Sequence, residues 1–156
     1  VKSSGLPRIL GVQAEGSAPL VLGHAVDHPE TVATAIRIGR PARGEQALQA
    51  AEESQGRIIA VSDQAILDMQ RRLAQEGIWV EPASAAGLAG LAHSLSRKEI
   101  DLRGKQVAAV CTGHGLKDPD LIASRMSAPA VLPAELAALE DAILSAQAKP
   151  FEGQAE

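Results

Sequence analysis

Short apolar runs alternate with helical patterns along this chain, and this alternation constrains its fold more than any other feature. Alternating strands and helices are typical of parallel α/β proteins. The apolar runs predict strands at residues 8–13, 57–61 and 106–111. The helical patterns predict helices at residues 31–38, 45–54, 63–76, 82–97 and 133–143. We therefore expect an α/β fold of three layers, a mostly parallel sheet with flanking helices.

The last of the predicted strands has the strongest pattern. Val107 to Cys111 is apolar on both alternations, as expected of a central parallel strand that is covered on two sides. Gly113 and Gly115 then end the run abruptly. We expect this strand inside the sheet, with Thr112 at its carboxyl end.

Composition limits the possible classes of protein. The 156 residues are 46% hydrophobic and 22% charged, which fits one soluble globular domain. We expect this domain over residues 1–148, followed by a disordered tail over residues 149–156. A formal charge of -4 and the lack of a Lys or Arg block argue against nucleic acid as a partner.

Cellular location follows from the same composition. A single cysteine, Cys111, excludes an intramolecular disulfide and fits a reducing cytoplasm. The apolar stretches are too short to span a membrane, and the start of the chain lacks the apolar core of a signal peptide. We expect a cytoplasmic protein. Because the first residue is Val1 and not Met, we also expect the chain to be the downstream part of a longer protein.

Two segments have the residues for a ligand site. The loop Thr112-Gly113-His114-Gly115 follows a predicted strand, and ligands of open α/β sheets bind beyond the carboxyl ends of strands. The alternative is a tight turn that serves only the fold. Glu81 and Ser84 offer a carboxylate, a hydroxyl and free helix amides together. The alternative there is an ordinary capped helix.

Other polar residues support weaker hypotheses. His24 and His28 have the spacing of metal ligands on a helix, but Pro29 favours a loop and nothing supplies an obvious third ligand, so we expect no metal site. Cys111 is better explained as a small buried hydrophobe than as a nucleophile. Three arginines could bind an anion, although a solvated helix end explains them equally well: Arg37, Arg40 and Arg43.

Five segments in this order and spacing resemble the threonine synthase family. They are Gln13-Ala14-Glu15-Gly16, the run from Thr31 to Gly39, Ala60-Val61-Ser62-Asp63, Glu81-Pro82-Ala83-Ser84-Ala85-Ala86, and the run from Thr112 to Pro119. The fourth segment is shared more widely, with the threonine dehydratases and serine racemases among the fold-type II pyridoxal-phosphate enzymes. The last segment, together with the run ending at Gly39, is what singles out threonine synthases.

The resemblance implies a fold, a cofactor and a reaction. The fold would be the large-domain portion of a tryptophan synthase beta-like structure, in a homodimer. The reaction would convert O-phospho-L-homoserine and water into L-threonine and phosphate with pyridoxal phosphate as cofactor. The runner-up is a threonine or serine dehydratase-like lyase on the same scaffold. The alternative from a different class is a non-catalytic α/β binding domain, which would be a stable monomer that does not bind pyridoxal phosphate.

The chain also departs from this family. Its members hold the cofactor by a Schiff-base lysine, an asparagine and a glycine-rich phosphate loop, all in a region that would precede this one. None of these is present, and no lysine of the chain sits in the family's lysine motif: Lys2, Lys98, Lys105, Lys117 and Lys149. The resemblance therefore implies the carboxyl-terminal portion of the enzyme, without a catalytic residue and inactive alone.

By resemblance, this portion forms a single wall of the cofactor site. Thr112 would face the pyridine nitrogen, with its hydroxyl as hydrogen-bond donor. A carboxylate there would hold a proton on the nitrogen, whereas a neutral hydroxyl cannot. Ala35, beside Ile36, would lie against one face of the ring. The edge of the cofactor would be lined by Glu81, Ser84 and Gly113. The resemblance assigns no role to His114 or Lys117.

Overall fold

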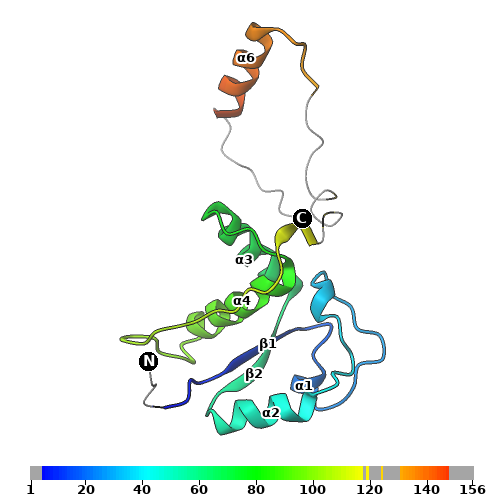
Figure 1. Cartoon of the computed structure of the whole chain (residues 1–156), viewed down its shortest axis with the longest axis vertical. Coiled ribbons are helices and arrows are strands. Elements are labelled where there is room, and N and C mark those ends of the chain that lie inside the picture. The colour runs from blue at the N-terminus through cyan, green and yellow to red at the C-terminus, as the bar shows by residue number, and fades with distance from the viewer. Residues whose placement is uncertain (1–4, 118, 120–123, 125–130, 148–156) are drawn as a thin grey trace. The chain divides into compact units, whose positions relative to one another are not determined.

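A computed structural model describes residues 5–117, 119, 124 and 131–147 (Figure 1). The chain divides into two compact units, Val1–Ile122 and Ala123–Glu156, and each is described by itself. The single domain expected over residues 1–148 stays a prediction. The tail expected over residues 149–156 lies outside the described residues.

The first unit is built on two parallel strands. β1 (Leu10–Ala14) pairs with β2 (Arg57–Val61), and Val12 lies opposite Ile59 in the register. Both strands were expected from their apolar runs, and the first is shifted toward the carboxyl end of the chain. The described residues of this unit therefore form an α/β structure with a small parallel sheet.

Helices flank these strands. They are α1 (Pro19–Leu22), α2 (Gly44–Glu53), α3 (Asp63–Gln75) and α4 (Pro82–Ser96). α4 packs against both strands and against α3, whereas α1 and α2 pack against β2. Figure 1 shows α4 and α2 on opposite sides of the strand pair. The strands are thus covered by a helix on each side.

The starts of α3 and α4 lie where local sequence signals predicted them. The Ser62 hydroxyl caps α3 by accepting a hydrogen bond from the Ala65 amide at 3.3 Å. Pro82 is the first residue of α4, where a missing amide hydrogen costs nothing. α4 comes close to β1 at Gly90, where an added Cβ would lie 2.4 Å from Val12 Cγ2.

The helix predicted over residues 31–38 is wrong. Only Thr34–Ile36 form a helical turn, the 3₁₀ helix η1. The Val32 amide donates to Asp63 Oδ2 at 2.9 Å, and the Thr31 hydroxyl donates to Asp63 Oδ1 at 2.5 Å. These contacts with a residue far along the chain hold the start of the segment outside helical geometry, and sequence periodicity cannot reveal them.

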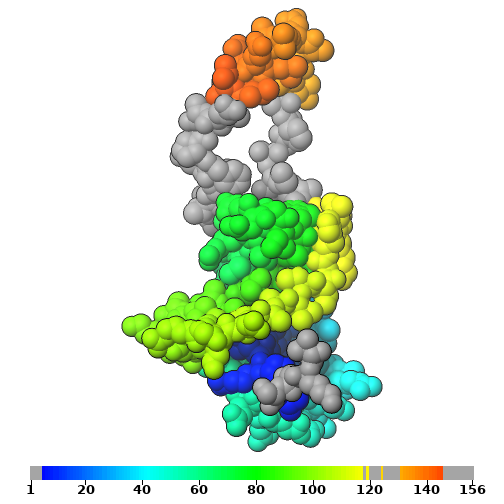
Figure 2. All heavy atoms as spheres, turned by 60° about the vertical axis from the view of Figure 1, so that its left-hand side comes forward, coloured from blue at the N-terminus to red at the C-terminus, as the bar shows by residue number. Residues whose placement is uncertain are grey.

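The predicted interior strand at Val107 to Cys111 is also wrong. This segment belongs to no sheet, and Val107 and Val110 are 50% and 80% exposed. It follows α4 in Figure 1 and lies on the surface in Figure 2. Among the described residues no strand lies beside it, and an interior strand requires neighbours and cover on both sides. Thr112 therefore follows an exposed segment, and Cys111 is exposed rather than buried.

A short 3₁₀ turn and a longer helix follow in the described chain. η2 (Gly115–Lys117) is a single 3₁₀ turn in the first unit. In the second unit, α6 (Leu136–Gln147) confirms the helix that was predicted near the carboxyl terminus. None of the described helices has the length and apolar character to cross a membrane.

Candidate functional site

The carboxyl ends of the two strands pack against the first turns of α4. Small buried side chains make this packing close, and they are Ala14, Ala33, Val61, Ala85 and Ala86. The last residues of β1 and β2 are both in this cluster, as is the residue that precedes η1. The cluster brings three of the segments that carry the family resemblance, residues 13–16, 31–39 and 60–63, to the same end of α4.

Three of the predicted site residues touch one another directly. The Glu81 amide donates to the Gly113 carbonyl at 3.0 Å, and the Gly113 amide donates to Ser84 Oγ at 2.8 Å. A Cβ at position 113 would lie 1.9 Å from Glu81 Oε1, so the loop can approach this closely only with glycine there. The loop after residue 111 is therefore fixed to the start of α4.

Contacts on both sides of Thr112 fix its backbone. Before it, Cys111 Sγ donates to the Ser84 carbonyl at 3.6 Å. After it, the Gly115 amide donates to the Trp79 carbonyl at 3.2 Å. Thr112 itself is exposed, and its hydroxyl makes no hydrogen bond with any residue that the structure describes. Within the part of the chain that the structure describes, the Thr112 hydroxyl is thus free to donate from a fixed loop.

Lys117 is a site residue whose role the sequence left open. Its Nζ lies 3.3 Å from Glu81 Oε2 and 3.4 Å from Oε1. The Glu81 side chain is only 3% exposed, whereas that of Lys117 is 60% exposed. The alternative for this segment, an ordinary capped helix, lacks its cap, because the Glu81 side chain makes no capping hydrogen bond. No sequence signal could pair residues 36 positions apart.

His114 has a local role in the same loop. Its backbone bridges to Val80, and its Nδ1 accepts a hydrogen bond from the Leu116 amide at 3.1 Å. The imidazole is exposed and caps the η2 turn. The structure therefore gives His114 a function in shaping the loop that presents Thr112.

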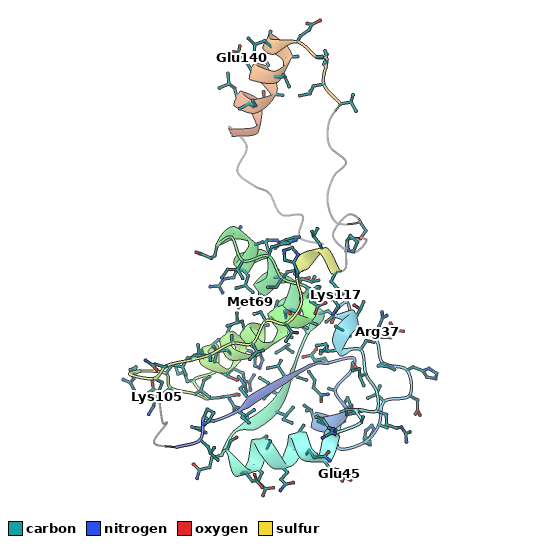
Figure 3. The ribbon with its side chains drawn as sticks, viewed as in Figure 1. Arg37, Glu45, Met69, Lys105, Lys117 and Glu140 are labelled. Atoms are coloured by element: carbon teal, nitrogen blue, oxygen red, sulfur yellow. The ribbon has the colours of Figure 1, made fainter. Side chains whose placement is uncertain are left out.

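Ala35 and Ile36 lie on η1, which packs against α4. Ala35 is exposed, while Ile36 packs against the core. The Ser17 hydroxyl donates to the Ile36 carbonyl at 3.1 Å and accepts from the Ile38 amide at 2.9 Å. Figure 3 shows Arg37, next to η1, and Lys117 toward the same end of α4. η1 is thus held firmly beside the helix whose first turn binds the Thr112 loop.

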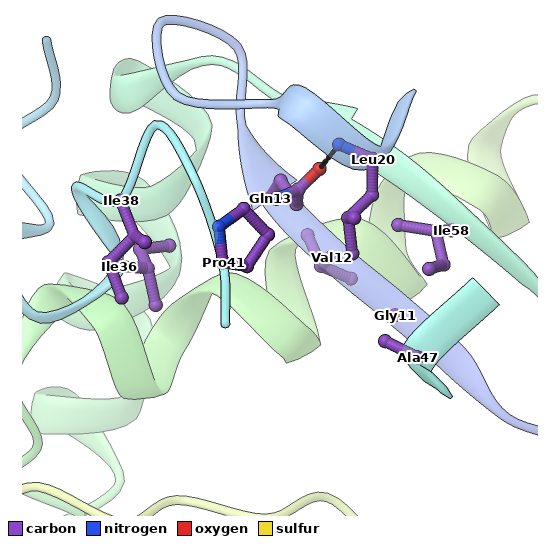
Figure 4. A pocket seen from close by; sticks show the side chains of 9 residues that line it. All are labelled: Gly11, Val12, Gln13, Leu20, Ile36, Ile38, Pro41, Ala47 and Ile58. Carbon is purple, nitrogen blue, oxygen red and sulfur yellow. Dashed lines mark hydrogen bonds between the residues drawn. The ribbon is translucent and has the colours of Figure 1, made fainter. Parts of the chain in front are cut away.

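An apolar cavity of about 250 Å³ opens on the side of the strands where α1 and α2 lie (Figure 4). Nine residues line it: Gly11, Val12, Gln13, Leu20, Ile36, Ile38, Pro41, Ala47 and Ile58. The polar side chain of its lining, that of Gln13, already accepts a hydrogen bond at Oε1 from the Leu20 amide at 2.9 Å. The lining contains no ionisable side chain, so we place no acid–base chemistry there.

The weaker sequence candidates do not join this site. His24 and His28 are exposed, and the described residues contain no group of three His, Cys, Asp or Glu side chains that could hold a metal. The three candidate anion-binding arginines are exposed: Arg37, Arg40 and Arg43.

Shifted carboxyl pKa values lie away from the Thr112 loop, just beyond α4. The hydrogen bond from Arg97 lowers the pKa of Glu99, and the charge of Arg57 lowers it further. Arg57 Nη2 lies 2.9 Å from Glu99 Oε2 and so ties the start of β2 to the end of α4. The hydrogen bond from Arg103 likewise lowers the pKa of Asp101.

Comparison with known proteins identifies the family of this chain. Residues 2–113 match the family described as "Pyridoxal-phosphate dependent enzyme". Threonine synthase from Mycobacterium tuberculosis (strain ATCC 25618 / H37Rv) is 49% identical over 131 residues, which are 83% of this chain and 36% of that protein. Threonine synthase from Halalkalibacterium halodurans is 46% identical over 144 residues, 91% of this chain and 40% of that protein.

A more distant threonine synthase and one solved structure also match parts of the chain. Threonine synthase from Methanosarcina acetivorans is 43% identical over 154 residues, covering 90% of this chain and 37% of that protein. The crystal structure of a T.th. threonine deaminase is 29% identical, with a TM-score of 0.46, and the match covers 56% of this chain and 34% of that one. The chain spans 36 to 40% of the length of these curated threonine synthases.

Proposed function

The chain belongs to the family of pyridoxal-phosphate dependent enzymes, and we propose that it is the carboxyl-terminal portion of a threonine synthase. The complete protein would convert O-phospho-L-homoserine and water into L-threonine and phosphate. Support comes from threonine synthases that are 43 to 49% identical over most of this chain. The observation that carries the proposal is the Thr112 loop, which holds a neutral hydroxyl, unpaired among the described residues, at a fixed place beside α4.

The residues present fit one wall of a pyridoxal-phosphate site. When bound, this cofactor supplies an electron sink for carbanion chemistry. Thr112 would donate its hydroxyl hydrogen to the pyridine nitrogen, and being neutral it would not hold a proton there as a carboxylate does. With a neutral hydroxyl at the nitrogen, the negative charge of the carbanion is less delocalised into the ring. That suits elimination and replacement at the β and γ carbons of the substrate.

The other predicted site residues would shape the same wall. Ala35, exposed on η1, would lie against one face of the ring, where a small side chain leaves room for stacking. Ile36 would support it from the core. The edge of the cofactor would be lined by Glu81, Ser84 and Gly113. Their task is to orient the ring and exclude water.

Proton transfer is assigned to the region of the enzyme outside this chain. Lys117 forms an ion pair with Glu81. Lys98 and Lys105 are exposed and lie beyond the carboxyl-terminal end of α4. We propose that the chain alone is inactive for this reason. The complete enzyme would be a cytoplasmic homodimer with a three-layer, mostly parallel sheet of the tryptophan synthase beta-like type.

The test is a product assay on the complete protein supplied with pyridoxal phosphate. With O-phospho-L-homoserine, we expect L-threonine and inorganic phosphate in equal amounts. Formation of a 2-keto acid and ammonia from L-threonine or L-serine, without threonine synthesis, would identify a dehydratase instead. A protein that binds no cofactor and forms neither product would be a non-catalytic domain, and the proposal would be wrong.

A further inference from the structure

A buried carboxylate lies directly behind the loop that carries Thr112. The Glu81 side chain is 3% exposed, and Gly113 packs so closely on it that an added Cβ would reach within 1.9 Å of Oε1. The Glu81 amide also holds the Gly113 carbonyl at 3.0 Å. The position of the loop and the position of this carboxylate are therefore coupled.

Only one cation compensates this carboxylate among the described residues. Lys117 Nζ lies 3.3 and 3.4 Å from the two Glu81 oxygens. Burying a carboxylate costs folding free energy unless an opposite charge and hydrogen bonds compensate its charge. Lys117 follows the Thr112 loop in sequence, whereas Glu81 precedes α4, so their contact closes the loop over the start of the helix.

We propose that the Glu81–Lys117 ion pair positions Thr112 for its partner, the pyridine nitrogen. Lys117 is a positioning residue, because its ammonium contacts Glu81 and acts on Thr112 only through the loop. The inference rests on the proposed function, since Thr112 needs a fixed position only if it meets a cofactor. It gives the lysine after the glycine loop a task separate from the Schiff-base lysine outside this chain.

The first experiment measures hydrogen exchange of the Gly113 amide in the purified 156-residue chain. This amide is bonded to Ser84 Oγ, so its exchange reports opening of the loop. We expect Lys117→Met to speed its exchange about tenfold. Lys117→Arg keeps the charge and should restore slow exchange. Lys105→Met, which removes an exposed lysine from another loop, should change nothing.

A double-mutant cycle separates the ion pair from a general loss of stability. Glu81→Gln keeps the shape of the side chain and removes the charge that requires Lys117. In that background, Lys117→Met should no longer speed exchange at Gly113. If Lys117→Met alone unfolds the chain, as judged by lost helical circular dichroism, the double variant should refold. Equal effects of Lys117→Met with and without Glu81→Gln would overturn the proposal, as would equal exchange in Lys117→Met and Lys105→Met.

The second experiment uses the complete protein with pyridoxal phosphate. We expect Lys117→Met to shift the absorption band of the bound cofactor and to lower kcat about tenfold at unchanged KM. Lys117→Arg should recover both. A wild-type spectrum and kcat in Lys117→Met would contradict the positioning role. If the wild-type complete protein makes no threonine, the proposed function fails, whereas the exchange experiment still decides whether the ion pair holds the loop.

Discussion

At the scale of single residues, Thr112 carries the chemistry proposed for this chain. Its hydroxyl is free within the described residues, and the contacts of Cys111 and Gly113 with Ser84 fix its backbone on both sides. The identity of the donor decides how the ring nitrogen is held. A hydroxyl leaves it unprotonated, whereas a carboxylate favours its protonated form.

Two substitutions of Thr112 in the complete protein test this role. Thr112→Asp should strengthen the electron sink and divert some of the reaction from threonine to a keto acid, which a product ratio measures. Thr112→Val removes the hydrogen bond and should weaken cofactor binding, by about tenfold. Wild-type activity, affinity and product ratio in both variants would show that Thr112 lies elsewhere.

Glu99 gives a second prediction at this scale. Because the Arg97 hydrogen bond is the largest cause of its lowered pKa, Arg97→Gln should raise that pKa more than Arg57→Gln does. The measurement is a carboxyl ¹³C NMR titration of Glu99. The control is Arg71→Gln, which removes the ion-pair partner of Asp68 and should leave the pKa of Glu99 unchanged. A larger rise with Arg57→Gln would contradict the assignment.

The sign of the accompanying pH effect follows from the lowered pKa of Glu99. A carboxyl whose pKa is lower in the folded than in the unfolded chain stabilises the fold above its unfolded pKa. That contribution is lost as the pH falls through the folded pKa. Any stability that wild type gains over Arg97→Gln should therefore be present at neutral pH and vanish in acid.

At the scale of elements, α4 organises both the core and the site. One of its ends receives the Thr112 loop, and farther along the helix Gly90 permits a close approach to β1. An added Cβ at Gly90 would lie 2.4 Å from Val12 Cγ2 and 3.3 Å from Ile59 Cδ1. Gly87, on the same helix, has nothing within 4 Å of the corresponding point. The two glycines therefore form a matched pair.

Alanine substitutions at these glycines should have opposite effects on the free energy of unfolding. Gly90→Ala overpacks the contact with β1 and should destabilise the chain by about 1–3 kcal/mol. Gly87→Ala adds helix propensity at an open position and should stabilise it by up to about 1 kcal/mol. Urea unfolding followed by circular dichroism measures both. Equal or higher stability of Gly90→Ala would mean that α4 does not pack on β1 as described.

The elements also show what the sequence could predict. β2, α3 and α4 depend on local signals, an apolar run, the Ser62 cap and Pro82, and these were predicted well. Residues 31–38 depend instead on Asp63 and Ser17, which are distant in sequence. Residues 107–111 have the pattern of an interior strand but no neighbouring strand among the described residues. Non-local partners decided both errors.

The candidate site was predictable to a similar extent. Glu81, Ser84 and Gly113 lie in the two segments that the sequence indicated as candidate ligand sites, and hydrogen bonds bring these segments together. Their cofactor role remains a prediction. The role of Lys117 could not be predicted, because its partner lies 36 positions away and only the folded loop brings the two charges together.

At the scale of the whole molecule, we propose that this chain forms one wall of an active site and that the rest of the enzyme supplies the reactive lysine. Backbone amides around glycines anchor the phosphate of such cofactors, and we propose that this loop also belongs to the rest of the enzyme. A single hydroxyl and a small contact surface are too little to offset the entropy of binding a small molecule tightly. The chain alone should therefore not retain pyridoxal phosphate.

The most direct measurement of this claim is borohydride reduction of the complete protein with bound pyridoxal phosphate, followed by peptide mapping of the labelled lysine. We expect a pyridoxyl group on a lysine outside these 156 residues, and no label or phosphate release from O-phospho-L-homoserine when the chain is treated alone. A stoichiometric label within the chain, accompanied by turnover of the chain alone, would contradict the claim. The labelled residue would then be one of five: Lys2, Lys98, Lys105, Lys117 or Lys149.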